Sequence, residues 1–269
     1  MSSPIISFME TFLLCKPDYF KIDYSINPWM SGGFVNLNLA KDQWESLKLA
    51  IECLGSKVKT ISQINNLPDM VFTANSGLVF ENKFIVSSMK HSERKGESRY
   101  FRDWFLKNGY RTLDLPPDIS FEGRGDCLLY NNHIIGGYGY RTDLDALEAV
   151  SETLALPLIS LKLADPRFYH LDTCFCMISK HSAIYYPEAF EKNEIEKLKD
   201  KIELIPVSES DAALFMCNSM LVGNTLLIPS SYSSIDKVLR NNYGIKTCLV
   251  NVSEFLKSGG SIQCLCLKI

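Results

Sequence analysis

Five residues with chemically useful side chains recur along the chain at nearly equal intervals. Intervals of 51, 46, 46 and 46 residues separate, in order, Asn75, Asp126, Asp172, Asn218 and Cys264. A cysteine thiolate is a nucleophile, and carboxylates hold cationic groups through charge-assisted hydrogen bonds. A period of about 50 residues indicates a repeat architecture, whose equivalent positions can meet on a common axis. We therefore expect these five side chains to line one central pocket.

Two more candidate residues lie close to these positions in sequence. Glu122 belongs to the segment FEGRGD, and His170 to FYHLDT. On a strand, His170 and Asp172 would face the same side, because they are two residues apart. A histidine with a pKa near neutrality can move protons for a nucleophilic cysteine. The alternative interpretation is structural, since a histidine before a strand can serve packing and Asp or Asn often opens a turn.

Each of the first four polar residues opens a pair of apolar runs separated by turn residues, which predicts a β-hairpin. Helical spacing of apolar residues follows each hairpin, and a short apolar strand comes next. The expected helices are 42–54, 93–108, 143–155, 187–199 and 233–242, and the expected strands are 58–62, 110–115, 156–161, 202–207 and 245–250. Cys264 opens a last apolar run without a returning strand, and segment 6–17 could pair with it. This pattern predicts an α/β fold with five repeats in a closed ring, as a single domain over residues 1–269.

Composition narrows the functional classes. The net charge of −3 gives no basic surplus for binding nucleic acid, and no apolar run approaches the roughly 20 residues of a membrane span. The N-terminus has no basic region or cleavage site typical of a signal peptide. Nine cysteines without a CxxC pair indicate a reducing compartment, so we expect a cytoplasmic protein with mostly buried, reduced cysteines. Cys174 with Cys176, and Cys264 with Cys266, would point the same way on strands.

Metal chemistry is not expected. The four histidines show no metal-ligand spacing with the cysteines; they are His91, His133, His170 and His181. Hydrolysis by a cysteine nucleophile requires neither a metal nor another cofactor. We therefore predict that the protein has none.

Short motifs along nearly the whole chain resemble those of the guanidino-group-modifying superfamily. In chain order they are NPWM at 27–30, DMVFTAN at 69–75, ERKGE at 93–97, FEGRGD at 121–126, GYGYRT at 137–142, HLDT at 170–173, CN at 217–218 and GGSIQC at 259–264. The superfamily includes arginine deiminases, dimethylarginine dimethylaminohydrolases, amidinotransferases and arginine dihydrolases. The resemblance implies a five-bladed α/β propeller, the pentein fold, with the active site on its axis.

The resemblance also implies roles for individual residues. Cys264 matches the nucleophile, His170 the catalytic histidine and Glu122 the acid that works with it. Because Arg124 is inserted in the acidic motif, Asp126 is a second candidate for that acidic role. Asp172 matches the carboxylate that holds the guanidinium. The expected substrate-binding positions are Arg94 and Arg141 for an α-carboxylate, with Asp69, Asn27, Asn75, Asp126 and Asn218 as further pocket residues.

One departure bears on the product. Arginine deiminases carry an aspartate where this chain has Asn75, whereas arginine dihydrolases resemble it in that asparagine and in the NPWM segment. The expected substrate is a small guanidino compound, L-arginine or a methylarginine, and the expected reaction is that of an arginine dihydrolase. A deiminase or methylarginine hydrolase, an amidinotransferase and a non-catalytic binding protein remain alternatives, and a homo-oligomer is possible. Several dihydrolases carry a further C-terminal domain, whose function we do not expect here.

Overall fold

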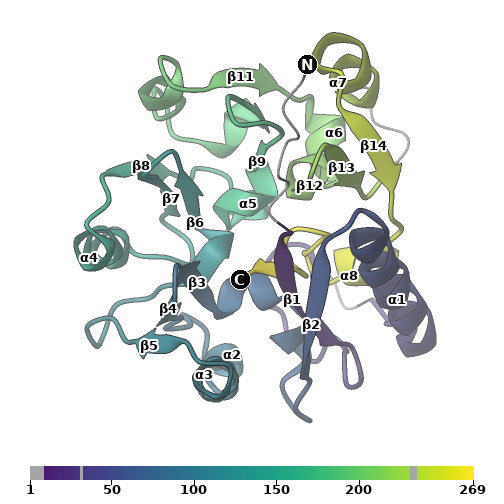
Figure 1. Cartoon of the computed structure of the whole chain (residues 1–269), viewed down its shortest axis with the longest axis vertical. Coiled ribbons are helices and arrows are strands. Elements are labelled where there is room, and N and C mark those ends of the chain that lie inside the picture. Colours follow the sequence, from purple (N-terminus) through teal and green to yellow (C-terminus); the bar gives the residue numbers. More distant parts are fainter. Residues whose placement is uncertain (1–8, 31–32, 231–234) are drawn as a thin grey trace.

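Five small sheets surround a common axis. The structure is a computed structural model, and it describes residues 9–30, 33–230 and 235–269. Within these ranges, the strands form five three-stranded sheets, and Figure 1 shows the sheets as blades of a ring with helices at the rim. The five α/β repeats in a closed ring confirm the prediction from the repeat period, and the fold is the pentein propeller that the resemblance implied.

The blades share one strand pattern. Blade by blade, the strands are β15 (Leu267–Lys268), β1 (Thr11–Lys16) and β2 (Lys57–Ser62); β3 (Gly77–Phe80), β4 (Lys83–Val86) and β5 (Arg111–Leu113); β6 (Cys127–Tyr130), β7 (His133–Tyr138) and β8 (Leu158–Lys162); β9 (Phe175–Met177), β10 (Ser182–Tyr185) and β11 (Glu203–Pro206); and β12 (Met220–Val222), β13 (Thr225–Ile228) and β14 (Lys246–Leu249). In each blade the inner strand is antiparallel to the middle strand, and the middle strand is parallel to the outer one. The parallel pair requires a crossover connection, which rim helices provide in four of the five blades.

The ring is closed by the two ends of the described chain. Strand β15 pairs with β1 in antiparallel register, with Phe12 opposite Lys268 and Leu13 opposite Leu267. This confirms the expected pairing of the N-terminal segment with the last repeat, although residues 6–8 of that segment lie outside the described residues. The closing strand begins three residues after Cys264.

The crossover helices confirm most of the sequence expectations. Helix α1 (Leu37–Cys53) begins five residues before the expected start, because the side chain of Asn36 caps it by accepting a hydrogen bond from the Leu39 N–H. The expected helix 93–108 is divided at Gly96 into α2 (Ser92–Lys95) and α3 (Glu97–Lys107). The other rim helices are α4 (Leu144–Leu154) and α7 (Ile235–Tyr243), and the predicted start of α7 at 233 lies outside the described residues.

The helix expected at 187–199 is wrong. This segment forms two 3₁₀ turns, Pro187–Ala189 and Ile195–Leu198. Between them Asn193 has a φ of 69°, a left-handed conformation that interrupts a right-handed helix. The crossover of the fourth blade is therefore made by turns.

A single helical turn precedes each inner strand and carries the repeated polar residue. Asn75 lies in the 3₁₀ turn Thr73–Ser76, Asp126 follows Gly123–Gly125, Asp172 lies in α5 (Leu171–Cys174), Asn218 ends Met216–Asn218, and Cys264 lies in a turn at 262–265. The expectation that His170, Asp172 and Cys264 lie on strands was therefore wrong. The turns point these side chains towards the axis. On a strand, successive side chains would point to opposite faces.

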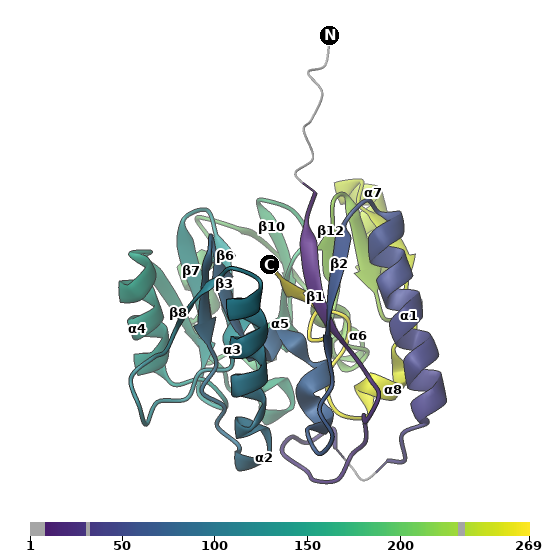
Figure 2. The ribbon, with the colours of Figure 1, turned by 60° about the horizontal axis from the view of Figure 1, so that its bottom comes forward.

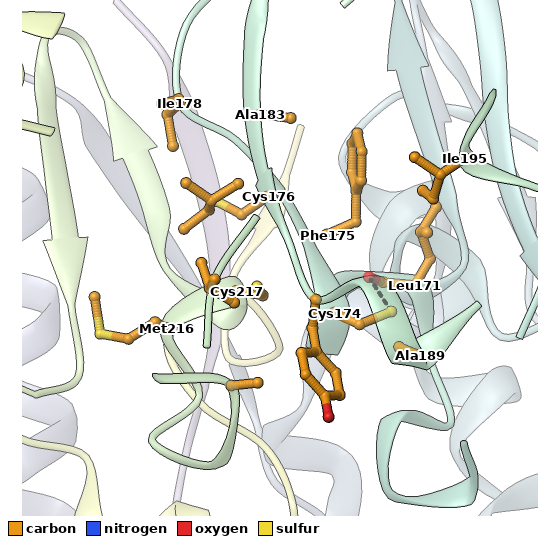
Figure 3. Close-up of a cluster of buried hydrophobic side chains, with 14 of the residues drawn as sticks. Leu171, Cys174, Phe175, Cys176, Ile178, Ala183, Ala189, Ile195, Met216 and Cys217 are labelled. Carbon is orange, nitrogen blue, oxygen red and sulfur yellow. Dashed lines mark hydrogen bonds between the residues drawn. The ribbon is translucent and has the colours of Figure 1, made fainter. Parts of the chain in front are cut away.

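Buried apolar side chains fix these turns against the strands. Figure 3 shows the cluster around α5, where Leu171 and Cys174 lie near Phe175, Met216 and Cys217. The Cys174 thiol donates to the carbonyl oxygen of Leu171 at 3.5 Å, while Cys176 lies on β9. The expected same-side arrangement of the two cysteines on one strand was wrong. All nine cysteines are free, and seven are buried, which confirms that most are reduced core residues.

Two short helices complete the description, α6 (Glu209–Ala213) and α8 (Ser253–Leu256). Figure 2 shows the segment after β1 crossing the lower face of the ring before α1 begins. No helix in the described ranges is long and apolar enough to cross a membrane.

Candidate active site

The nucleophile candidate lies in contact with a carboxylate and an amide. Cys264 Sγ is 3.5 and 3.7 Å from the two carboxylate oxygens of Asp172, and Asn218 Nδ2 donates to the sulfur at 3.1 Å. The Asn218 side-chain oxygen accepts from the Cys264 N–H at 3.2 Å and the Ser261 N–H at 3.0 Å. Asn218 therefore ties the cysteine turn to the sulfur that the turn presents.

The histidine candidate is oriented by an acid and an arginine. His170 Nε2 lies 2.8 Å from Glu122 Oε2, and Arg141 Nη1 donates to the same oxygen at 2.9 Å. The backbone N–H of Lys90 donates to the other Glu122 oxygen at 3.2 Å. His170 Nδ1 has no hydrogen-bond partner among the described residues. The ring is thus held through one nitrogen while the other is free to exchange a proton with a bound molecule.

Both carboxylate oxygens of Asp126 accept hydrogen bonds from neighbouring residues. Its Oδ1 accepts from the Leu171 N–H at 2.9 Å, and its Oδ2 accepts from the Thr142 hydroxyl at 2.7 Å. Asp126 Oδ2 is 3.8 Å from His170 Nε2, a full ångström farther than Glu122. The geometry favours Glu122 as the acid that works with His170, and Asp126 as the residue that fixes the start of α5.

The Asn75 side chain is oriented by Arg94. Arg94 Nη1 donates to Asn75 Oδ1 at 2.9 Å, and Arg94 is paired with Glu97 through two hydrogen bonds of 3.0 and 2.9 Å. Asn75 Nδ2 has no partner among the described residues. It lies beside Gly125, where a Cβ would come within 2.4 Å of Nδ2 and 3.4 Å of His170 Cγ. Glycine at this position therefore keeps open the space that Asn75 and His170 border.

The two arginines expected to bind an α-carboxylate are already engaged. Besides Glu97 and Asn75, Arg94 donates to the carbonyl oxygen of Asp69 at 3.1 Å. Arg141 donates to Glu122 and, at 2.8 Å, to the carbonyl oxygen of Ile26, and its guanidinium lies 4.6 Å from the ring centre of Tyr169. A carboxylate role for either arginine stays a prediction, and it requires some of these bonds to be exchanged.

The segment before α1 covers the site. Asn27 Nδ2 donates to the Ser258 carbonyl oxygen at 3.0 Å, and the Tyr24 hydroxyl donates to Asp69 Oδ2 at 3.0 Å. Trp29 Nε1 donates to the Arg167 carbonyl oxygen at 2.6 Å. The candidate residues are consequently all buried, each exposing 9% or less of its surface.

The structure adds residues that sequence reasoning missed. Tyr169 donates to the Gly259 carbonyl oxygen at 2.7 Å beside the His170 ring, and Thr142 accepts from the Glu122 N–H at 3.0 Å. Ser258 donates to Asp69 Oδ1 at 3.2 Å. Tyr169 could have been noticed because it adjoins His170. Glu97 and Thr142 could have been noticed because they end the motifs ERKGE and GYGYRT, whereas Ser258 gave no comparable signal.

Burial and charge set the protonation states. Burial raises the pKa of Asp172 to about 7, and the Cys264 thiol and the Arg124 charge oppose this rise. Burial, followed by the Asp172 charge, raises the pKa of Cys264 well above its usual range. Burial acts to raise the pKa of Glu122, but Arg141 and His170 outweigh it and hold that pKa low. These directions favour a neutral Cys264 thiol and an ionised Glu122.

Metal-ligand geometry is also informative. Among the described residues, no group of three or more His, Cys, Asp or Glu side chains is arranged to hold a metal ion. The polar groups at the axis instead provide a thiol, an imidazole and carboxylates around one small space.

Five α/β blades with a cysteine, a histidine and acidic residues on the axis define a member of the guanidino-group-modifying superfamily. A family model described as "N,N dimethylarginine dimethylhydrolase, eukaryotic" matches residues 26–269. The chain therefore belongs to the N,N-dimethylarginine dimethylhydrolase family.

Similar proteins carry hydrolase names. The chain is 39% identical to the bifunctional arginine dihydrolase/ornithine cyclodeaminase ArgZ of Synechocystis sp. over 96% of its length, and it spans 37% of that protein. It is 36% identical to the corresponding enzyme AgrE of Nostoc sp., again over 96% of the chain and 37% of the relative. It is 37% identical to the dimethylarginine dimethylaminohydrolase of Mycobacterium tuberculosis, over 96% of the chain and 85% of the relative. The chain thus spans little more than a third of the bifunctional enzymes.

The structural comparison agrees with this family. The N-terminal domain of the cyanobacterial arginine dihydrolase ArgZ, in a substrate-bound mutant, superposes with a TM-score of 0.93 at 37% identity. That match covers 96% of this chain and 97% of the compared chain.

Proposed function

We propose that this protein hydrolyses the guanidino group of L-arginine through a covalent adduct on Cys264, and that it carries arginine on to ornithine, ammonia and carbon dioxide. The overall reaction consumes two water molecules and releases two ammonia molecules and one carbon dioxide for each arginine. The arginine dihydrolase relatives support the substrate class, and the orientation of Asn75 supports the product.

The first step is attack of the Cys264 sulfur on the guanidinium carbon. The raised pKa of Cys264 favours the protonated thiol before a cation is bound. A guanidinium bound against Asp172 would place a positive charge beside the sulfur and favour the thiolate. Asp172 is suited to hold that cation, because its carboxylate lies 3.5 Å from the sulfur. The substrate therefore contributes the charge that activates its own nucleophile.

His170 is the proton carrier in this proposal. In the first half-reaction it donates a proton to the nitrogen that leaves as ammonia, which leaves a thiouronium on Cys264. In the second half-reaction it removes a proton from the attacking water, and citrulline departs as the sulfur is restored. The unpartnered Nδ1 of His170 supports this role, since Nε2 is already held by Glu122.

In this proposal, Asn75 determines whether arginine is hydrolysed once, to citrulline, or twice, to ornithine. Because Arg94 holds the Asn75 oxygen, the Nδ2 donor is left without a partner beside His170. A carbonyl oxygen of a neutral ureido group would accept from this donor, whereas an aspartate in its place offers only acceptors. Citrulline is therefore retained and polarised for a second hydrolysis, which yields ornithine, ammonia and carbon dioxide.

The second candidate is a dimethylarginine dimethylaminohydrolase, which the matched family model favours. This enzyme would release citrulline and dimethylamine. Purified protein should be incubated separately with L-arginine and N,N-dimethylarginine, and the products identified by mass spectrometry. Ornithine from arginine supports the proposal. Citrulline alone identifies a deiminase, citrulline with dimethylamine identifies the second candidate, and inactivity with every guanidino substrate favours a binding protein.

A further inference from the structure

Arg124 occupies a separate part of the axis from the reacting groups. It lies in the 3₁₀ turn Gly123–Gly125, between Glu122 and Asp126, and it is the residue inserted in the acidic motif. Its side chain lines a cavity of about 180 Å³ bounded by inner strands β6, β9 and β12. Asp172 lines the same cavity and also contacts the Cys264 sulfur. Asp172 is thus shared by the cavity and the nucleophile.

Arg124, which is partly exposed, differs in its pairing from the buried arginines Arg94 and Arg141. Arg94 and Arg141 each donate to a carboxylate at 2.9 Å, which accounts for their burial as ion pairs. Arg124 Nη1 is buried, and no atom of the described residues accepts a hydrogen bond from it. Arg124 as a whole is partly exposed, but a buried guanidinium N–H without an acceptor is unfavourable, so a purely structural role explains Arg124 poorly.

The electrostatic neighbour of Arg124 is Asp172. Burial lowers the pKa of Arg124, and the Asp172 charge is the largest influence that opposes this lowering. The titratable groups that act on Asp172 or feel its charge are Cys264, Arg124, Tyr169, Cys174 and Cys176. Arg124 is the cation in this set. The remaining groups that feel the Arg124 charge are Glu10, Cys127 and Cys266.

We propose that Arg124 is a positioning residue that acts through Asp172, keeping the Asp172 carboxylate ionised in the water-excluded site so that it can hold a cationic guanidino group. The proposal rests on the guanidino hydrolysis proposed above. It offers a reason for the arginine within the segment FEGRGD, where its side chain lines the same cavity as Asp172.

The test is the pH dependence of kcat/KM for arginine, followed by ammonia release between pH 5 and 9. Arg124→Met removes the charge and keeps much of the side-chain length. The acid limb of the kcat/KM profile of this variant should move to higher pH by roughly one unit, because a nearby opposite charge lowers the pKa of a carboxylate by about 1–3 units. Arg99→Met removes the charge of an exposed arginine and should leave the profile unchanged. A folded Arg124→Met protein with the wild-type acid limb would overturn the proposal.

Arg124→Lys gives an independent measurement if the Met variant does not fold. A buried lysine has a lowered pKa and can lose its charge in the alkaline range, whereas arginine cannot. Arg124→Lys should therefore keep the acid limb of the wild type and show a new loss of kcat/KM above about pH 8. An Arg124→Lys profile identical to the wild type at alkaline pH would contradict the proposal. If the wild type releases ammonia normally, either negative result rejects only the role of Arg124; if the wild type acts on no guanidino substrate, both proposals fail.

Discussion

Arg94 Nη1 and Asn75 Oδ1 form a 2.9 Å hydrogen bond, which leaves the Nδ2 donor of the Asn75 amide available to a bound molecule. Since Arg94 is itself fixed by two bonds to Glu97, turning the amide would break this bond and set Asn75 Nδ2 against the Arg94 donor. The Asn75 side chain is thus presented as a donor, although asparagine could equally have been an acceptor.

This arrangement predicts the effect of Asn75→Asp. The aspartate would pair with Arg94 and would offer no N–H to a ureido oxygen, so citrulline should accumulate from arginine in place of ornithine. The ratio of citrulline to ornithine, measured by mass spectrometry, should rise at least about tenfold, the loss of one hydrogen bond to a bound group. Asn108→Asp, an exposed control, should leave the ratio unchanged. If the wild type already stops at citrulline, Asn75 does not select the product.

Cys264→Ser should abolish turnover and leave the fold intact. A serine hydroxyl is far less acidic than a thiol but has a similar shape, so kcat should fall by at least about 10⁴-fold with an unchanged circular dichroism spectrum. Cys266→Ser is the matched control, because Cys266 is equally buried but its thiol makes no hydrogen bond to Asp172 or Asn218 in the described structure. It should retain most of the activity. An inactive Cys266→Ser with an active Cys264→Ser would reverse the assignment.

His170→Ala should slow both halves of the reaction. Loss of a proton carrier costs about 10²–10⁴-fold in rate, and here it affects departure of ammonia as well as attack by water. Acid quenching followed by intact-protein mass spectrometry measures how fast the covalent adduct forms and disappears. Normal formation with slow breakdown would restrict His170 to the hydrolytic half.

Asp172→Asn should stabilise the protein at alkaline pH while removing activity. Burial raises the pKa of Asp172 from 3.8 to about 7, so the folded protein binds this proton more tightly than the unfolded chain does. The associated stability is complete below about pH 4 and is lost as the pH rises through about 7. The variant should therefore gain Tm at pH 8, by roughly 2–4 °C for each kcal/mol, and little at pH 4. The exposed Asp103→Asn serves as the control, and an equal gain at both pH values would contradict the explanation.

Trp29→Ala should weaken retention of the intermediate. Trp29 holds the covering segment through its 2.6 Å bond to the Arg167 carbonyl oxygen and through aromatic contacts with Phe168 and Phe215. Loss of these contacts should raise KM for arginine roughly tenfold and increase the share of citrulline released. Trp29→Phe keeps an aromatic ring and should lie between the wild type and Trp29→Ala. Unchanged KM and products in Trp29→Ala would show that this anchor does not limit escape.

The repeat was predictable because every blade has the same order of strands and a polar residue or cysteine shortly before its inner strand. Spacing alone placed Asn75, Asp172 and Cys264 on one axis, and the N-terminal segment was correctly expected to close the ring. The local conformation was not predictable, since short apolar segments such as HLDTCF fit a strand pattern although residues 171–174 form a helical turn. That turn is selected by long-range contacts, including the bond from the Leu171 N–H to Asp126.

The ion pairs that Arg94 and Arg141 form with buried carboxylates could not be predicted from the sequence either. Arg94 and Arg141 were expected to face a substrate carboxylate, but their carboxylate partners lie 3 and 19 residues away in sequence. The Arg94–Glu97 spacing fits a helical pair, yet the same pattern on a surface would carry no information about the site. The role of Arg94 in fixing Asn75 emerges only when helix α2 packs against the turn before β3, 19 residues earlier in the chain.

The pairing of β15 with β1 also has a consequence for how the protein folds. This contact joins Phe12 to Lys268, so forming it requires closure of almost the whole chain, which is slow compared with forming any one hairpin. Cys264 lies directly before β15, and the turn that holds it is bonded to the second blade through the Ala74 N–H. Recovery of catalysis after dilution from denaturant should therefore lag behind recovery of secondary structure. The rate at which enzyme activity returns would measure the final step of folding, the pairing of β15 with β1.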